Sequence, residues 1–224
     1  MSRQQLPLAL RAPRRPRFDN FVSGSNRATV ELLAQGLEPG SWYFLAGPAG
    51  SGRSHLLSAT FTDRLGRGES ALFLALSLPA NVGLLDQASA DCILLDDIDA
   101  LAGQDAAEIC LFNALNRWRA ERSTVLMSGA SRQGFTLPDL RSRLGQAARL
   151  TIKPLEEPDL RALIARLAAE YEVLLGRGAA DYLLTRSARS AASIARLIEQ
   201  LSSRALTERR TLSVPMIREA LKAD

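Results

Sequence analysis

Short apolar runs alternate with longer amphipathic stretches over the first two thirds of the chain. Runs of strand length occupy residues 42–46, 71–76, 92–95 and 124–128, with a fifth candidate at 149–152. Helical spacing covers 53–65 and 106–119, and in the second stretch Ile109, Phe112, Leu115 and Trp118 recur on one face. Continuously apolar strands separated by helices predict a mostly parallel sheet with helices on both faces.

The last third has only helical signals. Pro158 suits the first turn of a helix that runs to about Glu170, and further helices are predicted over 179–186 and 191–206. Ser213 can cap a final helix that has Pro215 in its first turn. We therefore expect an α/β domain over residues 18–153, a small all-helical lid domain over 154–224, and an extended tether over 1–17, where Pro13 and Pro16 interrupt the arginines.

Composition narrows the class of protein. The chain has 224 residues, and no apolar run approaches the roughly 20 residues of a spanning helix, so a cytoplasmic protein without membrane contact is expected. Cys92 and Cys110 fall in apolar stretches and His55 is the sole histidine, which argues against a zinc site. The net charge is +4, but only Lys153 and Lys222 are lysines. Genomic base composition explains this arginine bias as well as a nucleic-acid partner does.

The strongest chemical signal follows the first predicted strand. Residues 47–54 read Gly-Pro-Ala-Gly-Ser-Gly-Arg-Ser, a phosphate loop in which Arg53 replaces the usual lysine. Gly47, Gly50 and Gly52 allow the backbone N–H groups, including that of Ser51, to turn toward phosphate oxygens, and Ser54 is a candidate Mg²⁺ ligand. A guanidinium keeps the charge but changes its shape, so binding is expected to survive better than hydrolysis. The alternative is a Gly/Ser-rich turn without a ligand.

Two acidic residues close the 92–95 strand. Asp96 is a candidate for the Mg²⁺ shell, and Asp97 for orienting an attacking water. In an open α/β sheet, ligands bind at the carboxyl ends of the strands. Two aspartates after a strand also occur as loop caps, but together with the phosphate loop they predict a nucleotide site.

Several motifs in order resemble the DnaA/Hda family of AAA+ replication proteins. They are the entry segment from Phe18 to Arg27, the phosphate loop followed by His55-Leu56-Leu57, Asp96-Asp97-Ile98, the segment from Leu137 to Leu144, and the lid. The resemblance implies an AAA+ P-loop NTPase core. It implies that Phe21, Val22 and His55 border the bound ADP or ATP.

The resemblance also implies two partners. Gln5, Leu6, Leu8 and Leu10 resemble a peptide that binds the DNA polymerase III sliding clamp, and Arg143 falls in the arginine-finger box. The finger would act on ATP held by DnaA, convert DnaA to its ADP form and so prevent re-initiation. Because the sequence ends at Asp224 soon after the lid, we expect no C-terminal DNA-binding domain, and contact with DNA mainly through the clamp. A finger that needs a neighbour implies assembly, and a homodimer is one candidate.

Two sensor positions complete the comparison. Ser128, at the end of a strand, is the nearest candidate for the first sensor, with Gly129 and Ser131 as alternatives. Ala192 stands where the family has a lid arginine, and Arg189 and Arg196 lie one turn away on either side. This departure implies a preference for ADP and weak ATPase activity, or none. An independent AAA+ ATPase that loads or remodels other proteins, and a DNA-binding module, remain alternatives.

Overall fold

A computed structural model describes residues 15–186, 190–208 and 211–223. The chain divides into two compact units, one spanning Arg15–Pro154 and the other containing Leu155–Asp224. Each unit has its own secondary structure.

The first unit is built on a five-stranded parallel sheet. The strand order is β2-β3-β4-β1-β5, and each neighbouring pair is parallel. The strands are β1 (Trp42–Ala46), β2 (Ala71–Ala75), β3 (Cys92–Asp96), β4 (Thr124–Gly129) and β5 (Ala148–Thr151). The helices are α1 (Arg27–Gln35), α2 (Arg53–Gly66), α3 (Pro79–Val82), α4 (Asp105–Glu121) and α5 (Pro138–Gly145), with 3-10 turns η1 (Phe18–Asn20), η2 (Gly24–Asn26) and η3 (Ile98–Leu101).

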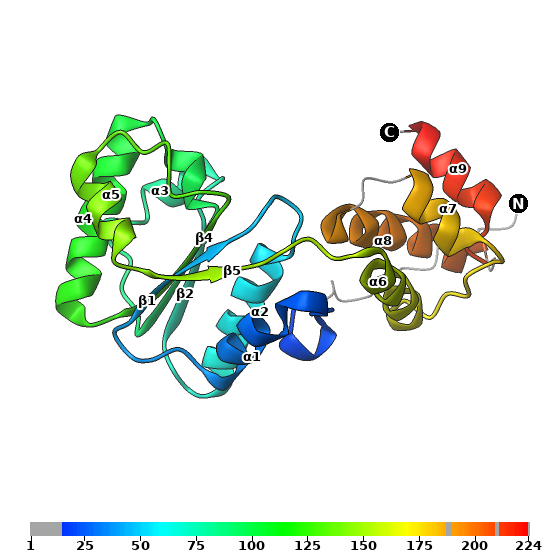
Figure 1. Ribbon diagram of the computed structural model, residues 1–224, viewed down its shortest axis with the longest axis horizontal. Helices are drawn as coiled ribbons and strands as arrows, with labels where there is room; N and C mark the ends of the chain where they lie inside the picture. Colours follow the sequence, from blue (N-terminus) through cyan, green and yellow to red (C-terminus); the bar gives the residue numbers. More distant parts are fainter. Residues whose placement is uncertain (1–14, 187–189, 209–210, 224) are drawn as a thin grey trace, which may run out of the picture. The chain divides into compact units, whose positions relative to one another are not determined.

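Alternate residues of the central strands face two separate helix layers. On one face, side chains such as Phe44 and Met127 pack with α4 and α5, and on the other, Leu45 and Leu126 pack with α1 and α2. Figure 1 shows α4 and α5 on one side of the sheet and α1 and α2 on the other. Every residue of β1, β3 and β4 is buried, since both faces of the sheet are covered. The predicted three-layer α/β core is therefore confirmed.

The predicted strands and long helices appear within one or two residues of their expected ends, but three helices were not predicted. The missing elements are α1, α3 and α5, each nine residues or shorter. The predicted apolar face of α4 was also partly wrong, because Ile109 is 49% exposed. The buried face of α4 instead runs through Ala107, Glu108, Leu111, Ala114, Leu115 and Trp118. The helix was predicted correctly, but its buried face is rotated around the axis from the predicted one and includes the charged residue Glu108.

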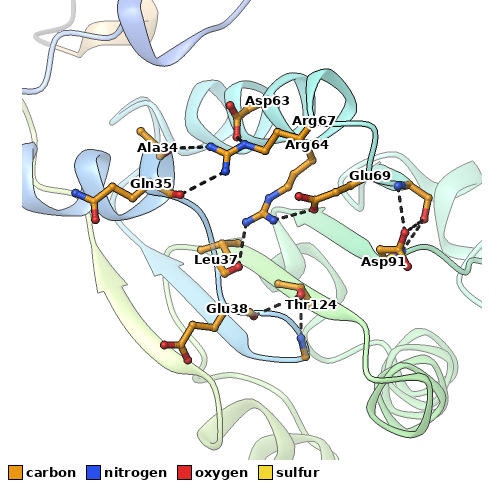
Figure 2. A network of polar contacts seen from close by, with 12 residues as sticks. Ala34, Gln35, Leu37, Glu38, Asp63, Arg64, Arg67, Glu69, Asp91 and Thr124 are labelled. Carbon is orange, nitrogen blue, oxygen red and sulfur yellow. Dashed lines mark hydrogen bonds and ion pairs between the residues drawn. The ribbon is translucent and has the colours of Figure 1, made fainter.

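An arginine network fastens α2 to the end of α1 at the edge away from the phosphate loop (Figure 2). Arg64, whose side chain is 7% exposed, donates to Glu69 at 2.8 Å and to the carbonyl of Leu37 at 3.1 Å. Arg67 donates to the carbonyl of Ala34 at 3.0 Å. These carbonyls follow or end α1 and lack partners within the helix, so the guanidinium groups cap α1 from α2.

The second unit is helical. It contains α6 (Glu157–Glu170), α7 (Ala179–Arg186), α8 (Ala191–Glu208) and α9 (Val214–Ala223). Leu163, Ile164, Leu183, Ile194 and Ile198 are among its buried side chains. Among the described residues, no helix has both the length and the apolar character that a membrane crossing requires.

Candidate nucleotide-binding site

The phosphate loop joins β1 to α2 and depends on glycine at two close approaches. A Cβ at Gly47 would lie 2.8 Å from the carbonyl oxygen of Ile152, and one at Gly52 would lie 2.6 Å from the ring of Phe21. Gly52 also has a φ of +102°, which an L side chain rarely adopts. The loop is therefore closed on one side by the segment after β5 and on the other by the entry segment.

Arg53 is held inside the loop rather than extended into solvent. Its Nη1 donates to the carbonyl of Gly47 at 2.7 Å, and its Nη2 donates to Asp97 Oδ1 at 2.7 Å. The Arg53 side chain is 9% exposed and that of Asp97 is 35% exposed. The two arms of the guanidinium thus bridge the start of the phosphate loop and the end of β3, which a lysine ammonium cannot do with the same planar fork.

Ser128 organises the acidic pair. Its buried hydroxyl donates to Asp96 Oδ1 and accepts the backbone N–H of Asp97 at 3.1 Å. Asp97 itself adopts a left-handed conformation, with φ 55° and ψ 52°, which an aspartate tolerates better than most residues. Ser128, the predicted sensor, therefore positions the carboxylate of Asp96 and the backbone of Asp97. The sequence did not predict this contact between β4 and β3.

The surroundings of Asp97 raise the pKa of its carboxyl group above the usual aspartate value. Burial raises the pKa of Asp97, the neighbouring Asp96 raises it further, Arg53 lowers it and Asp99 raises it, and the net direction is upward. The guanidinium of Arg53 thus opposes the burial and the neighbouring carboxylates that raise this pKa. Removing the guanidinium would raise the pKa of Asp97 further.

The entry segment lies against the phosphate loop. Phe21 contacts His55, with ring centroids 5.3 Å apart, and His55 Nε2 lies 3.0 Å from the carbonyl oxygen of Arg17. Val22 follows Phe21 and is half-buried, as are Phe21 and His55. Phe21 and His55, two residues predicted to border the nucleotide, therefore meet at the start of α2.

Asn20 and Asn26 hold the entry segment in place. Both belong to the sequence motif, but the sequence did not predict which groups they bind. Asn20 Oδ1 accepts the N–H of Arg17 at 2.9 Å, and Asn20 Nδ2 donates to the carbonyl of Arg15. Asn26 makes a reciprocal pair with the backbone of Lys153, at 2.9 and 2.7 Å. Arg15 and Arg17, which the sequence places in an extended tether, thus belong to the packed entry segment.

The remaining nucleotide-site candidates differ in exposure. Ser51 is buried, and its hydroxyl has no hydrogen-bond partner among the described residues. Asp96 is 5% exposed, whereas Ser54 at the start of α2 is exposed. A buried hydroxyl without a partner inside a curled glycine loop fits a polar ligand such as a phosphate group.

Arg143 lies on α5, in the helix layer opposite α2. Its Nε donates to Asn116 Oδ1 of α4 at 2.8 Å, and the residue is half-exposed. Arg141, two residues earlier on the same helix, is exposed. The guanidinium of Arg143 is therefore oriented by a side chain of its own unit, and sequence spacing had no signal for Asn116.

Other predicted positions cannot be placed at this site. Gln5, Leu6, Leu8 and Leu10 lie outside the described residues, as does Arg189. Ala192 and Arg196 are exposed on α8 of the second unit.

Comparisons with known proteins place the chain among AAA+ proteins. Residues 156–221 match the family model described as Hda, lid domain. An uncharacterised protein of Haemophilus influenzae is 25% identical over 97% of this chain and 98% of its own length. Among solved structures, domain III of Thermotoga maritima DnaA matches with a TM-score of 0.76 at 17% identity, covering 92% of this chain and 95% of that one. AMPPCP-bound DnaA from Aquifex aeolicus matches with a TM-score of 0.67 at 25% identity, covering 87% and 66%.

Proposed function

We propose that this chain, an AAA+ protein related to Hda and DnaA, is a regulator that inactivates DnaA after replication has started. In this proposal it binds a nucleotide, associates with the DNA polymerase III sliding clamp and uses Arg143 to stimulate hydrolysis of ATP held by DnaA. The observation that carries the proposal is the match of the helical unit to the Hda lid, because the α/β core by itself is shared with other AAA+ proteins.

The phosphate loop supports nucleotide binding. Its curled backbone, the partnerless hydroxyl of Ser51 and the N-terminus of α2 would receive the phosphates. Ser54 and Asp96 would hold Mg²⁺, and Phe21, Val22 and His55 would border the base. When bound, Mg²⁺ neutralises charge on the phosphate oxygens.

Arg53 supports the proposal of weak hydrolysis by this chain. Its guanidinium is engaged by the carbonyl of Gly47 and by Asp97, the residue that would orient an attacking water. Asp97 therefore carries out two tasks that compete. The alanine at position 192, where the family has a lid arginine, would remove a contact to a γ-phosphate, and for this reason we propose a preference for ADP over ATP.

Arg143 supports action on a neighbour. Its half-exposed side chain is held by Asn116 on the helix layer opposite the phosphate-loop helix. A guanidinium presented to the ATP of another subunit stabilises charge in the transition state, an effect worth roughly 10³–10⁵ in rate in other NTPases. In this proposal the neighbour is DnaA. Residues Gln5, Leu6, Leu8 and Leu10 would bring the two together by binding the clamp.

The test measures hydrolysis of ATP prebound to DnaA in the presence of DNA-loaded clamp and the ADP complex of this chain. We expect strong stimulation that falls at least about tenfold with Arg143→Ala and with the double variant Gln5→Ala, Leu8→Ala. Arg141→Ala is the matched control, since it removes an exposed arginine from the same helix. Absence of stimulation by the wild-type chain would refute the proposal.

An independent AAA+ ATPase is the alternative, and the Asp96–Asp97 pair beside the phosphate loop favours it. It predicts sustained ATP turnover by the isolated chain, without DnaA or clamp, that is lost in Asp97→Asn. The regulator proposal predicts a low turnover in the same assay and a large one after DnaA is added.

A further inference from the structure

A buried carboxylate on α4 joins two segments of the chain. One follows Asp97, and the other leads into α5, which carries Arg143. Glu108 is fully buried, and its Oε1 accepts the backbone N–H of Gly103 at 2.7 Å. The same carboxylate accepts the N–H of Thr136 at 2.9 Å and that of Leu137 at 2.8 Å. Gly103 follows the turn η3 that comes after Asp97, whereas Leu137 is the N-cap residue of α5.

This environment favours the ionised form of Glu108. Burial alone would raise its pKa, but the N–H groups of Leu137, Thr136 and Gly103 oppose this, and the pKa lies below the usual glutamate value. A charged carboxylate bonded to backbone N–H groups makes stronger bonds than a neutral acceptor does. The loop that enters α5 is thus fastened to α4 by charge-assisted bonds.

Glu108 and Asn116 together hold α5 at two points. They lie roughly two turns apart on α4 and about 80° apart around its axis, and each bonds to the segment that contains α5. Glu108 binds the residue that begins α5, and Asn116 binds Arg143 in its last turn. The apolar side chains of Leu140 and Leu144 pack between these points in the core. The start of α5 therefore cannot shift without breaking the bonds that Thr136 and Leu137 donate to Glu108.

We infer that Glu108 is a positioning residue for Arg143, one that acts through the N-terminus of α5 and never touches the nucleotide. This inference rests on the proposed function, because it assumes that Arg143 is the group presented to DnaA. A shift of about 1 Å in a catalytic group is enough to lower a rate by roughly a hundredfold. Glutamine at position 108 offers one acceptor oxygen and an NH₂ group, so at least one backbone N–H would face another donor.

The test compares Glu108→Gln with the wild-type chain in the DnaA assay, over a range of concentrations of this chain. We expect the maximal stimulated rate to fall about tenfold or more, while the half-saturating concentration changes less than about threefold. In an Arg143→Ala background, Glu108→Gln should have no further effect. Glu121→Gln, which removes an exposed carboxylate from the same helix, should behave as wild type.

A merely structural role would give a different pattern. Loss of folded protein would raise the half-saturating concentration and leave the maximal rate at saturation unchanged. A wild-type maximal rate for Glu108→Gln, or an additive loss in the Arg143→Ala background, would overturn the inference. If Glu108→Gln does not fold, Glu108→Asp replaces it, since aspartate keeps the charge but is too short to reach both loops.

Hydrogen exchange separates this inference from the proposed function. In Glu108→Gln, the amides of Gly103, Thr136 and Leu137 and those of α5 should lose protection while the amides of β1 keep theirs. Unchanged protection across α5 would overturn the inference whatever the DnaA assay shows. If wild-type protein fails to stimulate DnaA but α5 loses protection, the proposed function fails and the contact between Glu108 and α5 stands.

Discussion

The contact between Arg53 and Asp97 leads to a prediction that needs no partner protein. Arg53→Met removes the guanidinium and keeps a side chain of similar length, while Asp97→Asn removes the charge and keeps an acceptor oxygen. Both bonds of Arg53 are 2.7 Å long and its side chain is 9% exposed. We expect Arg53→Met to lower the free energy of unfolding of the core unit in buffer without nucleotide.

The size of this loss in unfolding free energy depends on how deeply Arg53 and Asp97 are buried. Removing one partner of a fully buried ion pair costs about 3–5 kcal/mol, because the other charge stays behind. Asp97 is 35% exposed, so water screens part of this cost, and about 1–3 kcal/mol is expected. Asp97→Asn leaves the guanidinium of Arg53, which is 9% exposed, without its counter-charge, so a similar cost of about 1–3 kcal/mol is expected, reduced by the loss of repulsion from Asp96.

Urea unfolding followed by tryptophan fluorescence measures this effect. The two tryptophans, Trp42 and Trp118, are buried in the core unit, so the signal reports on that unit. A double-mutant cycle of Arg53→Met and Asp97→Asn should give a coupling of about 1–2 kcal/mol. Arg141→Met serves as the control, with a change within about 0.5 kcal/mol for an exposed site.

The pH dependence of the unfolding free energy supplies a second check, because the raised pKa of Asp97 fixes the direction of the change. The pKa of Asp97 is raised in the folded state, so its ionisation opposes folding above the ordinary aspartate value of about 4. Without Arg53 that pKa rises further. The deficit of Arg53→Met should therefore grow with pH between the folded pKa of Asp97 in the wild-type chain and its higher folded pKa in the variant. Additive effects in the cycle, or a deficit that does not change with pH, would refute this account of the site.

Three further predictions concern single positions. Gly52→Ala should abolish tight nucleotide binding in a titration with a fluorescent ADP analogue, because the new Cβ meets Phe21 at 2.6 Å, whereas Gly66→Ala, with open space around it, should leave binding unchanged. Asn26→Ala should lower the free energy of unfolding by about 2–4 kcal/mol in urea, since it leaves two backbone groups without partners, and a loss under 1 kcal/mol would contradict this. The depressed pKa of Glu108 means that its stabilisation is present above the ordinary glutamate value of about 4.3 and is lost as the pH falls through the lower folded value, so Glu108→Gln should flatten the acid side of the stability profile.

The sequence by itself determined the local elements and the identity of the chemical groups. Apolar runs marked the central strands β1, β3 and β4 because both faces of the sheet are covered there, and the glycines of residues 47–52 marked the phosphate loop because few other residues adopt that backbone. These signals are local, so they can be read without knowing what lies beside them. The shorter helices α1, α3 and α5 were missed because few turns give little periodicity.

Only the tertiary structure decided which groups meet. Arg53 binds Asp97, 44 positions later, Ser128 fixes Asp96, and Asn26 pairs with the backbone of Lys153, 127 positions away. The buried face of α4 differs from the predicted one because it includes Glu108. The N–H groups that bind Glu108 come from two loops, around Gly103 and Leu137. Hydrophobic periodicity reports burial of apolar groups along one element. It cannot report a buried charge whose N–H donors arrive from elsewhere in the chain, because only folding brings those donors together.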